Sequence, residues 1–171
     1  MTNKLYDLRK SFAYAFRGIV FCIRYERNMR IHIVATVYVM LAALFFYEFT
    51  RSELILLILT CVMVMTLEII NTAIEVLTDK ASPEYSTLAK VAKDTAAGAV
   101  LVASIAAIVI GVILFWNIER LSEIVALLLS NLFMGIAFLI SLLLSGIFIF
   151  TGKERRRRGG IHSPARNEKK P

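Results

Sequence analysis

Four polar residues lie on one predicted helix face within a mostly apolar segment: Glu68, Asn71, Glu75 and Asp79. Their spacings of three and four place them in one stripe if the segment is an α-helix. A carboxylate in the middle of a membrane helix costs roughly 2.5–3.5 kcal/mol to insert, so these groups are expected to face a bundle interior or a wet cavity. Carboxylate and amide oxygens suit Mg²⁺. The alternative is a polar contact between helices without chemistry, but carboxylates this close repel unless a cation or a proton lies between them.

The composition is that of an integral membrane protein. The chain has 171 residues, of which 58% are hydrophobic, and a mean hydropathy of +0.69. The net charge of +7 could indicate nucleic-acid binding, but its distribution along the chain argues against a nucleic-acid partner. The basic residues gather in alternate loops, so the excess is a topology signal.

Four apolar runs are long enough, or nearly long enough, to cross a bilayer, which takes roughly 20 residues. They cover about residues 31–47, 54–77, 96–116 and 124–150. Loop charges alternate basic, acidic, basic, acidic and basic, which predicts four spans with both termini in the cytoplasm of a cell-membrane protein. Leu5, Leu8, Phe12, Phe16 and Ile19 recur at helical spacing among basic residues, which predicts an amphipathic surface helix over about residues 4–28.

These elements define the expected fold: an all-α integral membrane protein with an N-terminal amphipathic surface helix, three core transmembrane helices and a fourth C-terminal one. We expect one catalytic domain over residues 1–118 and an additional hydrophobic span over 119–152. Residues 153–171 contain Arg155–Arg158 and read as a basic, disordered tail.

The predicted topology brings several charged side chains to the cytoplasmic interface, namely Glu26, Glu75, Asp79, Lys93 and Asp94. Carboxylates for a metal, a lysine for phosphate and a buried glutamate next to lipid fit phosphoryl transfer from a Mg-nucleotide to a lipid hydroxyl. The sequence has no G-x-x-x-x-G-K-[ST] loop and no protein-kinase motif set. Any nucleotide site must therefore be built from membrane helices and their ends.

The same residues resemble a known family, the prokaryotic diacylglycerol kinases. The resemblance lies in Glu68-x-x-Asn71-Thr72-Ala73-Ile74-Glu75-x-x-x-Asp79, followed by Glu84-Tyr85 and Ala92-Lys93-Asp94, and it covers about residues 5–118. The run Glu26-Arg27-Asn28-Met29-Arg30-Ile31-His32 is more similar to the Gram-positive branch, the undecaprenol kinases.

The resemblance implies a homotrimeric lipid kinase that uses ATP and Mg²⁺ and shares its active sites between protomers. Glu68 would be the general base, with Asn71 beside it at the lipid substrate. Glu26 and Glu75 would bind the metal ions. The nucleotide-binding residues would be Glu26, Glu75, Asp79, Glu84, Lys93 and Asp94, with Arg9, Tyr14 and Arg17 of the surface helix as weaker candidates. Gly98 would permit either close helix packing or close approach of the lipid.

Undecaprenol is the expected substrate, and diacylglycerol is the alternative. A small ion or proton transporter is a further possibility, because membrane carboxylates also build ion paths. However, the third span offers only Thr95 and Ser104 as polar residues after Asp94, so no polar path across the membrane is evident. The fourth span and the Arg-rich tail depart from the family pattern, and we assign them no chemical role from the sequence.

Overall fold

The computed structural model describes residues 2–81 and 86–152, and side chains from Leu8 onward within those ranges. The described residues form six α-helices: α1 (Thr2–Tyr25), α2 (Arg27–Phe45), α3 (Arg51–Ala81), α4 (Thr87–Phe115), α5 (Ile118–Ser130) and α6 (Leu132–Phe150). No strand occurs among them. Glu84 and the predicted basic tail over 153–171 lie outside the described residues.

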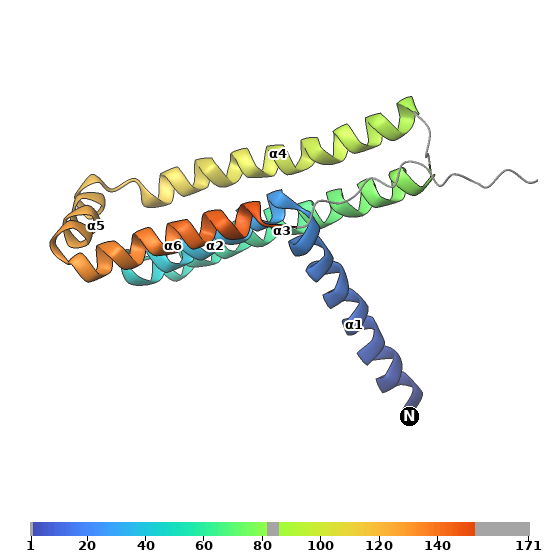
Figure 1. The fold of residues 1–171 in the computed structure, drawn as a ribbon, viewed down its shortest axis with the longest axis horizontal. Helices are drawn as coiled ribbons and strands as arrows, with labels where there is room; N and C mark the ends of the chain where they lie inside the picture. The colour runs from blue at the N-terminus through green and yellow to red at the C-terminus, as the bar shows by residue number, and fades with distance from the viewer. Residues whose placement is uncertain (1, 82–85, 153–171) are drawn as a thin grey trace, which may run out of the picture.

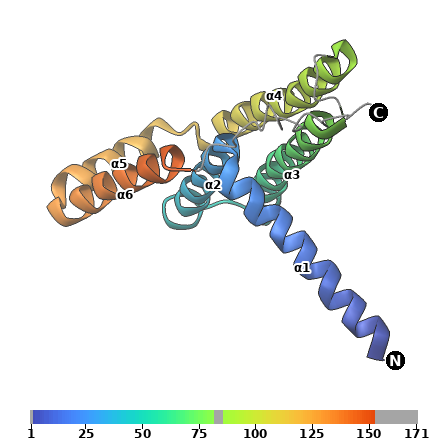
Figure 2. The same ribbon diagram turned by 45° about the vertical axis from the view of Figure 1, so that its right-hand side comes forward.

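Four of the described helices, α2, α3, α4 and α6, are long and apolar enough to cross a membrane. They confirm the predicted all-α membrane fold with four spans. The four helices run along a common direction, whereas α1 projects away from them at a steep angle (Figure 1). Helix α3 packs chiefly against α4, and α2 packs against both α3 and α6. The second view separates the α5–α6 pair from the α3–α4 pair, with α2 between them (Figure 2).

The helical conformation is interrupted between α1 and α2, at Glu26. This residue has an extended backbone, with φ −105° and ψ 117°, and it occupies the N-cap position of α2. The break allows α1 to leave the direction of the bundle while its last turn stays against α2 and α3. Glu26 therefore lies at a corner where three helices meet, which positions its carboxylate near the start of the first span.

A second break was not predicted: the apolar run over 124–150 is divided at Asn131. The side-chain oxygen of Asn131 accepts a hydrogen bond from the Met134 N–H at 3.2 Å, which caps α6. The turn is also tight, because a Cβ at Gly135 would lie 2.6 Å from the Leu128 carbonyl oxygen. Helix α5 is thus a separate amphipathic helix that carries Glu119, Arg120 and Glu123, and α6 alone forms the fourth span.

The interior of the described bundle is small and partly polar. Its buried apolar residues are Cys22, Met29, Ala43, Leu57, Val64, Ala96 and Val100, and its buried polar residues are Arg30, Glu68, Asn71 and Thr72. Large apolar side chains such as Leu59, Leu101 and Phe133 are exposed, as expected for helices that face lipid. The polar stripe of α3 therefore occupies the best-protected part of the molecule.

Candidate active site

The stripe predicted on α3 is confirmed as one helix face that begins deep in the bundle and ends in solvent. Glu68 is 2% exposed and Asn71 is 7% exposed. Glu75 is half-buried, and Asp79 is exposed at the end of the helix. Thr72 is buried beside Glu68 and donates its hydroxyl hydrogen to the Glu68 carbonyl oxygen at 2.9 Å. The face thus presents acidic groups at graded depth.

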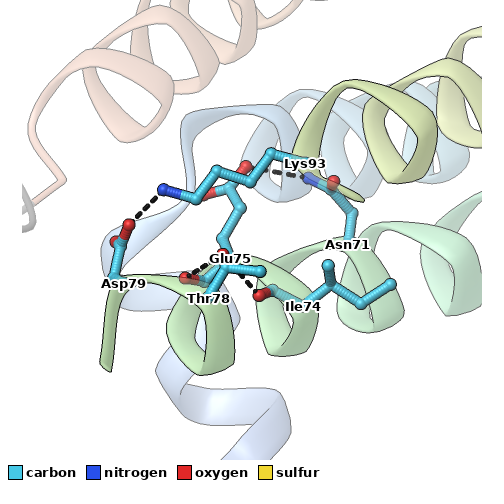
Figure 3. A network of polar contacts seen from close by, with 6 residues as sticks. All are labelled: Asn71, Ile74, Glu75, Thr78, Asp79 and Lys93. Atoms are coloured by element: carbon cyan, nitrogen blue, oxygen red, sulfur yellow. Dashed lines mark hydrogen bonds and ion pairs between the residues drawn. The ribbon is translucent and has the colours of Figure 1, made fainter. Parts of the chain in front are cut away.

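Two oxygens in the deep part of this stripe are left without a hydrogen bond. Glu68 Oε2 and Asn71 Oδ1 are both buried and have no partner among the described residues. The Asn71 amide nitrogen, in contrast, donates to Glu75 Oε1 at 3.2 Å (Figure 3). Buried polar atoms in native structures normally have partners, so unpaired acceptors mark a place for a cation, a proton donor or a hydroxyl.

Both residues open into a cavity of about 290 Å³ between α2, α3 and α4. Its other lining residues are Asn28, Ile31, His32, Ala97, Val100, Leu101 and Ser104. Asn28 interacts with the Glu68 carboxylate through its side chain. Asn28 and Ser104 were not predicted from the sequence to be site residues, although Asn28 belongs to the run that follows Glu26.

A second, more apolar cavity of about 370 Å³ lies next to the first. The two share Ile31, His32 and Ser104. The second continues between the same three helices past Val39, Leu57 and Gly111. The buried Glu68 therefore lines a cavity that adjoins a second, more apolar one, an arrangement that suits a molecule with a polar head and an apolar chain.

At the exposed end of the stripe, an ion pair joins α3 to α4. Lys93 Nζ contacts Asp79 Oδ1, and the two side chains are 30% and 39% exposed. Lys93 extends along α3 over Glu75 to reach Asp79 (Figure 3). The Thr78 hydroxyl donates to the carbonyls of Ile74 and Glu75 at 2.9 and 3.1 Å, so it is turned to the backbone and not to the ion pair. A cation and two acidic groups thus lie together at this end.

Glu26 approaches the stripe from the α1–α2 corner. Its carboxylate is close enough to Glu68 for a repulsive charge interaction, and Glu75 acts on Glu68 in the same way. The corner also holds Cys22, which is buried and whose side chain forms a hydrogen bond with the side chain of Thr72. Burial raises the pKa of the Cys22 thiol, and the nearby charges of Glu26 and Glu68 act in the same direction. Three carboxylates from two parts of the chain therefore share one region.

The donor set fits a hard cation, because it consists of carboxylate and amide oxygens and includes two buried acceptors without partners. Nevertheless, no group of three or more acidic, histidine or cysteine side chains within the described ranges is close enough to hold a metal by itself. Mg²⁺ commonly uses one or two carboxylates together with substrate phosphates, so an incomplete protein shell matches this metal.

The remaining predicted site residues are not brought to the stripe by this single chain. Arg9, Tyr14 and Arg17 are exposed on the projecting α1, where the Arg17 guanidinium lies over the Tyr14 ring at 5.6 Å. Asp94 is exposed next to Lys93 on α4. Gly98 does not line the cavity at Glu68, and a Cβ there would meet no atom within 4 Å. His32 lines both cavities.

The fold and this arrangement define a class: a multi-pass helical membrane protein with a carboxylate-rich site at one end of its bundle. The model of the prokaryotic diacylglycerol kinase family matches residues 13–115. The chain therefore belongs to the prokaryotic diacylglycerol kinase family.

Individual relatives agree with this assignment. The chain is 42% identical over 106 residues to a diacylglycerol kinase of Synechocystis sp., covering 61% of this chain and 60% of the relative. It is 38% identical over 113 residues to an undecaprenol kinase of Bacillus subtilis, covering 66% and 91%. It is 43% identical over 63 residues to a diacylglycerol kinase of Escherichia coli, covering 37% and 52%. The match thus spans less than two thirds of the Synechocystis and Escherichia relatives. No solved structure gives a significant match.

Proposed function

We propose that this chain transfers the γ-phosphoryl group of ATP to the hydroxyl of a membrane lipid, with undecaprenol as the substrate. The observation that carries the proposal is the position of Glu68, buried in the wall of a cavity that adjoins a second, more apolar one. A lipid alcohol needs this arrangement, because its hydroxyl must reach a base while its chain stays in an apolar environment. The names of the relatives support the same class of reaction.

Glu68 is the proposed general base. Its carboxylate accepts the hydroxyl proton as the lipid oxygen attacks the phosphoryl group, and burial keeps bulk water away from the transfer. Asn71 holds Glu75 through its amide nitrogen, and the residue lines the same cavity as Glu68. Asn28 orients the Glu68 carboxylate from α2. The contact with Asn28 holds the carboxylate, and the unpartnered Glu68 Oε2 is the proposed acceptor of the proton.

The charged end of the stripe is the proposed nucleotide site. When ATP binds, the Lys93 ammonium group leaves the Asp79 carboxylate and contacts phosphate oxygens. Asp94 contacts the sugar or the base of the nucleotide. Glu26 and Glu75 are the residues that would hold Mg²⁺, which supplies neutralisation of the phosphate charge when it is bound. Since ATP is a cytoplasmic substrate, this assignment puts the N-terminus and the site on the cytoplasmic side. An even number of spans puts the end of α6 there as well.

The reaction is tested with labelled ATP in mixed micelles that contain either undecaprenol or diacylglycerol at equal mole fraction. The proposal predicts Mg²⁺-dependent transfer of label to lipid, with undecaprenol the better acceptor by kcat/KM. The similarity of the run from Glu26 to His32 to the Gram-positive undecaprenol kinases supports this order. The reverse order would assign diacylglycerol, as in the names of the other relatives. If neither lipid becomes labelled, the kinase proposal is rejected and the ion transporter remains as the alternative.

We further propose a homotrimer with shared sites, on the basis of the family resemblance and the incomplete acidic shell of the single chain. Mixing a Glu68→Gln protein with an Asp94→Asn protein tests the sharing of sites. If one protomer supplies Glu68 and its neighbour supplies Asp94, mixed trimers regain some intact sites. If the mixed trimers are as inactive as each variant alone, both residues of a site come from the same chain.

A further inference from the structure

Arg30 is a buried charged residue that the proposed reaction does not use. It lies in the first turns of α2 and is 5% exposed. Its Nε donates to the Ile149 carbonyl at 3.0 Å, and its Nη1 donates to the carbonyls of Ile23 and Arg24 at 3.2 Å each. One guanidinium therefore bonds to the last turn of α1 and to the last turn of α6.

The chemistry of helix ends explains why an arginine suits this place. The last four carbonyls of a helix have no partner within the helix, and the C-terminal end of the helix dipole favours a cation. The planar guanidinium offers several donors in a fixed geometry, so it can serve two helix ends at once, whereas a lysine offers one compact charge. Arg30 is thus a shared cap that joins the two ends to α2.

The end of α6 fits closely around this side chain. A Cβ at Gly152 would lie 1.7 Å from Arg30 Nη1 and 1.9 Å from its Cζ. Position 152, two residues after the end of α6, must therefore be a glycine if Arg30 is to keep its place. At Gly146, on the same helix, a Cβ would meet no atom within 4 Å. The close approach is a property of the end of α6 and is not general along it.

A second set of contacts holds α6 to α2 near the middle of both helices. The Tyr38 hydroxyl lies 2.9 Å from Ser141 Oγ and 3.2 Å from Ser145 Oγ. The ring of Phe138 packs edge-on to the ring of Tyr38, with centroids 6.3 Å apart. Polar contacts between membrane helices fix a particular pairing and register. Helix α6 therefore packs on α2 through specific side-chain contacts.

Arg30 stands next to the corner of the candidate site. It lies one helical turn after Glu26, and Asn28 of the same turn lines the cavity at Glu68. The α1 turn that Arg30 caps also holds Cys22, which packs on Thr72 beside Glu68. A change in the position of the Arg30 side chain would therefore move the side chains that surround Glu68.

We propose that the fourth span, through Arg30, positions the α1–α2 corner of the kinase site. Arg30 is a positioning residue: it touches neither lipid nor nucleotide, and it acts through Glu26 and Asn28. The catalytic part of this proposal rests on the proposed function, whereas the docking part does not.

The test uses the full chain with Cys61→Ser, so that Cys22 is the remaining cysteine. Gly152→Ala places a methyl group where the guanidinium lies, and Gly146→Ala is the matched control on the same helix. Arg30→Lys keeps the charge and loses the shared cap. For each variant, the rate at which N-ethylmaleimide labels Cys22 in native membranes measures how far the last turn of α1 has become exposed. Lipid phosphorylation gives kcat and KM for Mg-ATP.

Gly152→Ala and Arg30→Lys are expected to raise the labelling rate severalfold and to lower kcat/KM for Mg-ATP by up to about 10²-fold, a loss that a misplacement near 1 Å can cause. Gly146→Ala should match the parent. Faster labelling with unchanged kinetics would overturn the positioning role, and unchanged labelling in both variants would overturn the docking role. Because labelling needs no turnover, it tests the docking even if the chain proves not to be a lipid kinase.

Discussion

The amide nitrogen of Asn71 donates to Glu75 Oε1 at 3.2 Å, one turn further along α3, while the amide oxygen of Asn71 is buried without a partner among the described residues. Asn71 thus lies between the buried Glu68 and the half-buried Glu75 on the same face of α3 and contacts Glu75. This hydrogen bond holds one Glu75 oxygen in place. The proposed assignment of Glu75 to the metal can be tested directly.

Glu75→Gln should raise the Mg²⁺ concentration needed for half-maximal activity by a large factor and leave little activity at ordinary Mg²⁺. A neutral amide oxygen is a much weaker ligand for a hard cation than a carboxylate. The measurement is a Mg²⁺ titration of lipid phosphorylation. Glu123→Gln on α5, an exposed partner of Arg120, is the control and should follow the parent curve. A parent-like Mg²⁺ dependence in Glu75→Gln would remove Glu75 from the metal shell.

Glu68→Gln should lower kcat by roughly 10²–10⁴-fold, the usual contribution of a general base. Glutamine keeps the size and the hydrogen bonds of the buried side chain but cannot accept the proton. Nucleotide affinity, measured by binding of a fluorescent ATP analogue, should stay near the parent value. Weaker nucleotide binding with normal turnover at saturation would instead make Glu68 a ligand-shell residue.

Lys93→Met should raise KM for ATP strongly while changing stability little. The Lys93–Asp79 pair is partly exposed, and such pairs contribute about 0–1 kcal/mol to folding. Thermal unfolding in detergent and ATP kinetics measure the two effects separately. The double exchange Lys93→Asp with Asp79→Lys restores an ion pair without restoring the phosphate contact, so it should remain impaired. Recovery of activity in that double variant would assign the pair a purely structural role.

Ala97→Leu should raise KM for the lipid, because the added side-chain atoms occupy the cavity of about 290 Å³ that Glu68 faces. Ala99 lies on the same helix, is exposed and does not line that cavity, so Ala99→Leu is the matched control. Lipid kinetics at saturating ATP measure the effect. Equal lipid KM values in the two variants would place the lipid hydroxyl elsewhere on the protein.

Much of this fold could be predicted because helical periodicity and span length are local properties of the sequence. The stripe from Glu68 to Asp79 is one such pattern, and its depth follows from the length of α3. The break at Asn131 was missed because both of its flanks are apolar, and a single capping hydrogen bond decides it. The site at Glu68 was predicted only in part: Asn28 and Ser104 join it through packing between α2, α3 and α4, which no local pattern records.

Arg30 and Ile149 are 119 residues apart in the chain, and this separation sets an order of events during synthesis. Helix α2 leaves the ribosome long before α6, and at about 5–20 residues per second the interval is roughly 6–24 s. During that interval Arg30 can cap α1 but has no contact with Ile149. The corner that carries Glu26 and Asn28 is encoded near the start of the chain, yet it reaches its final form only after the last described helix has been made.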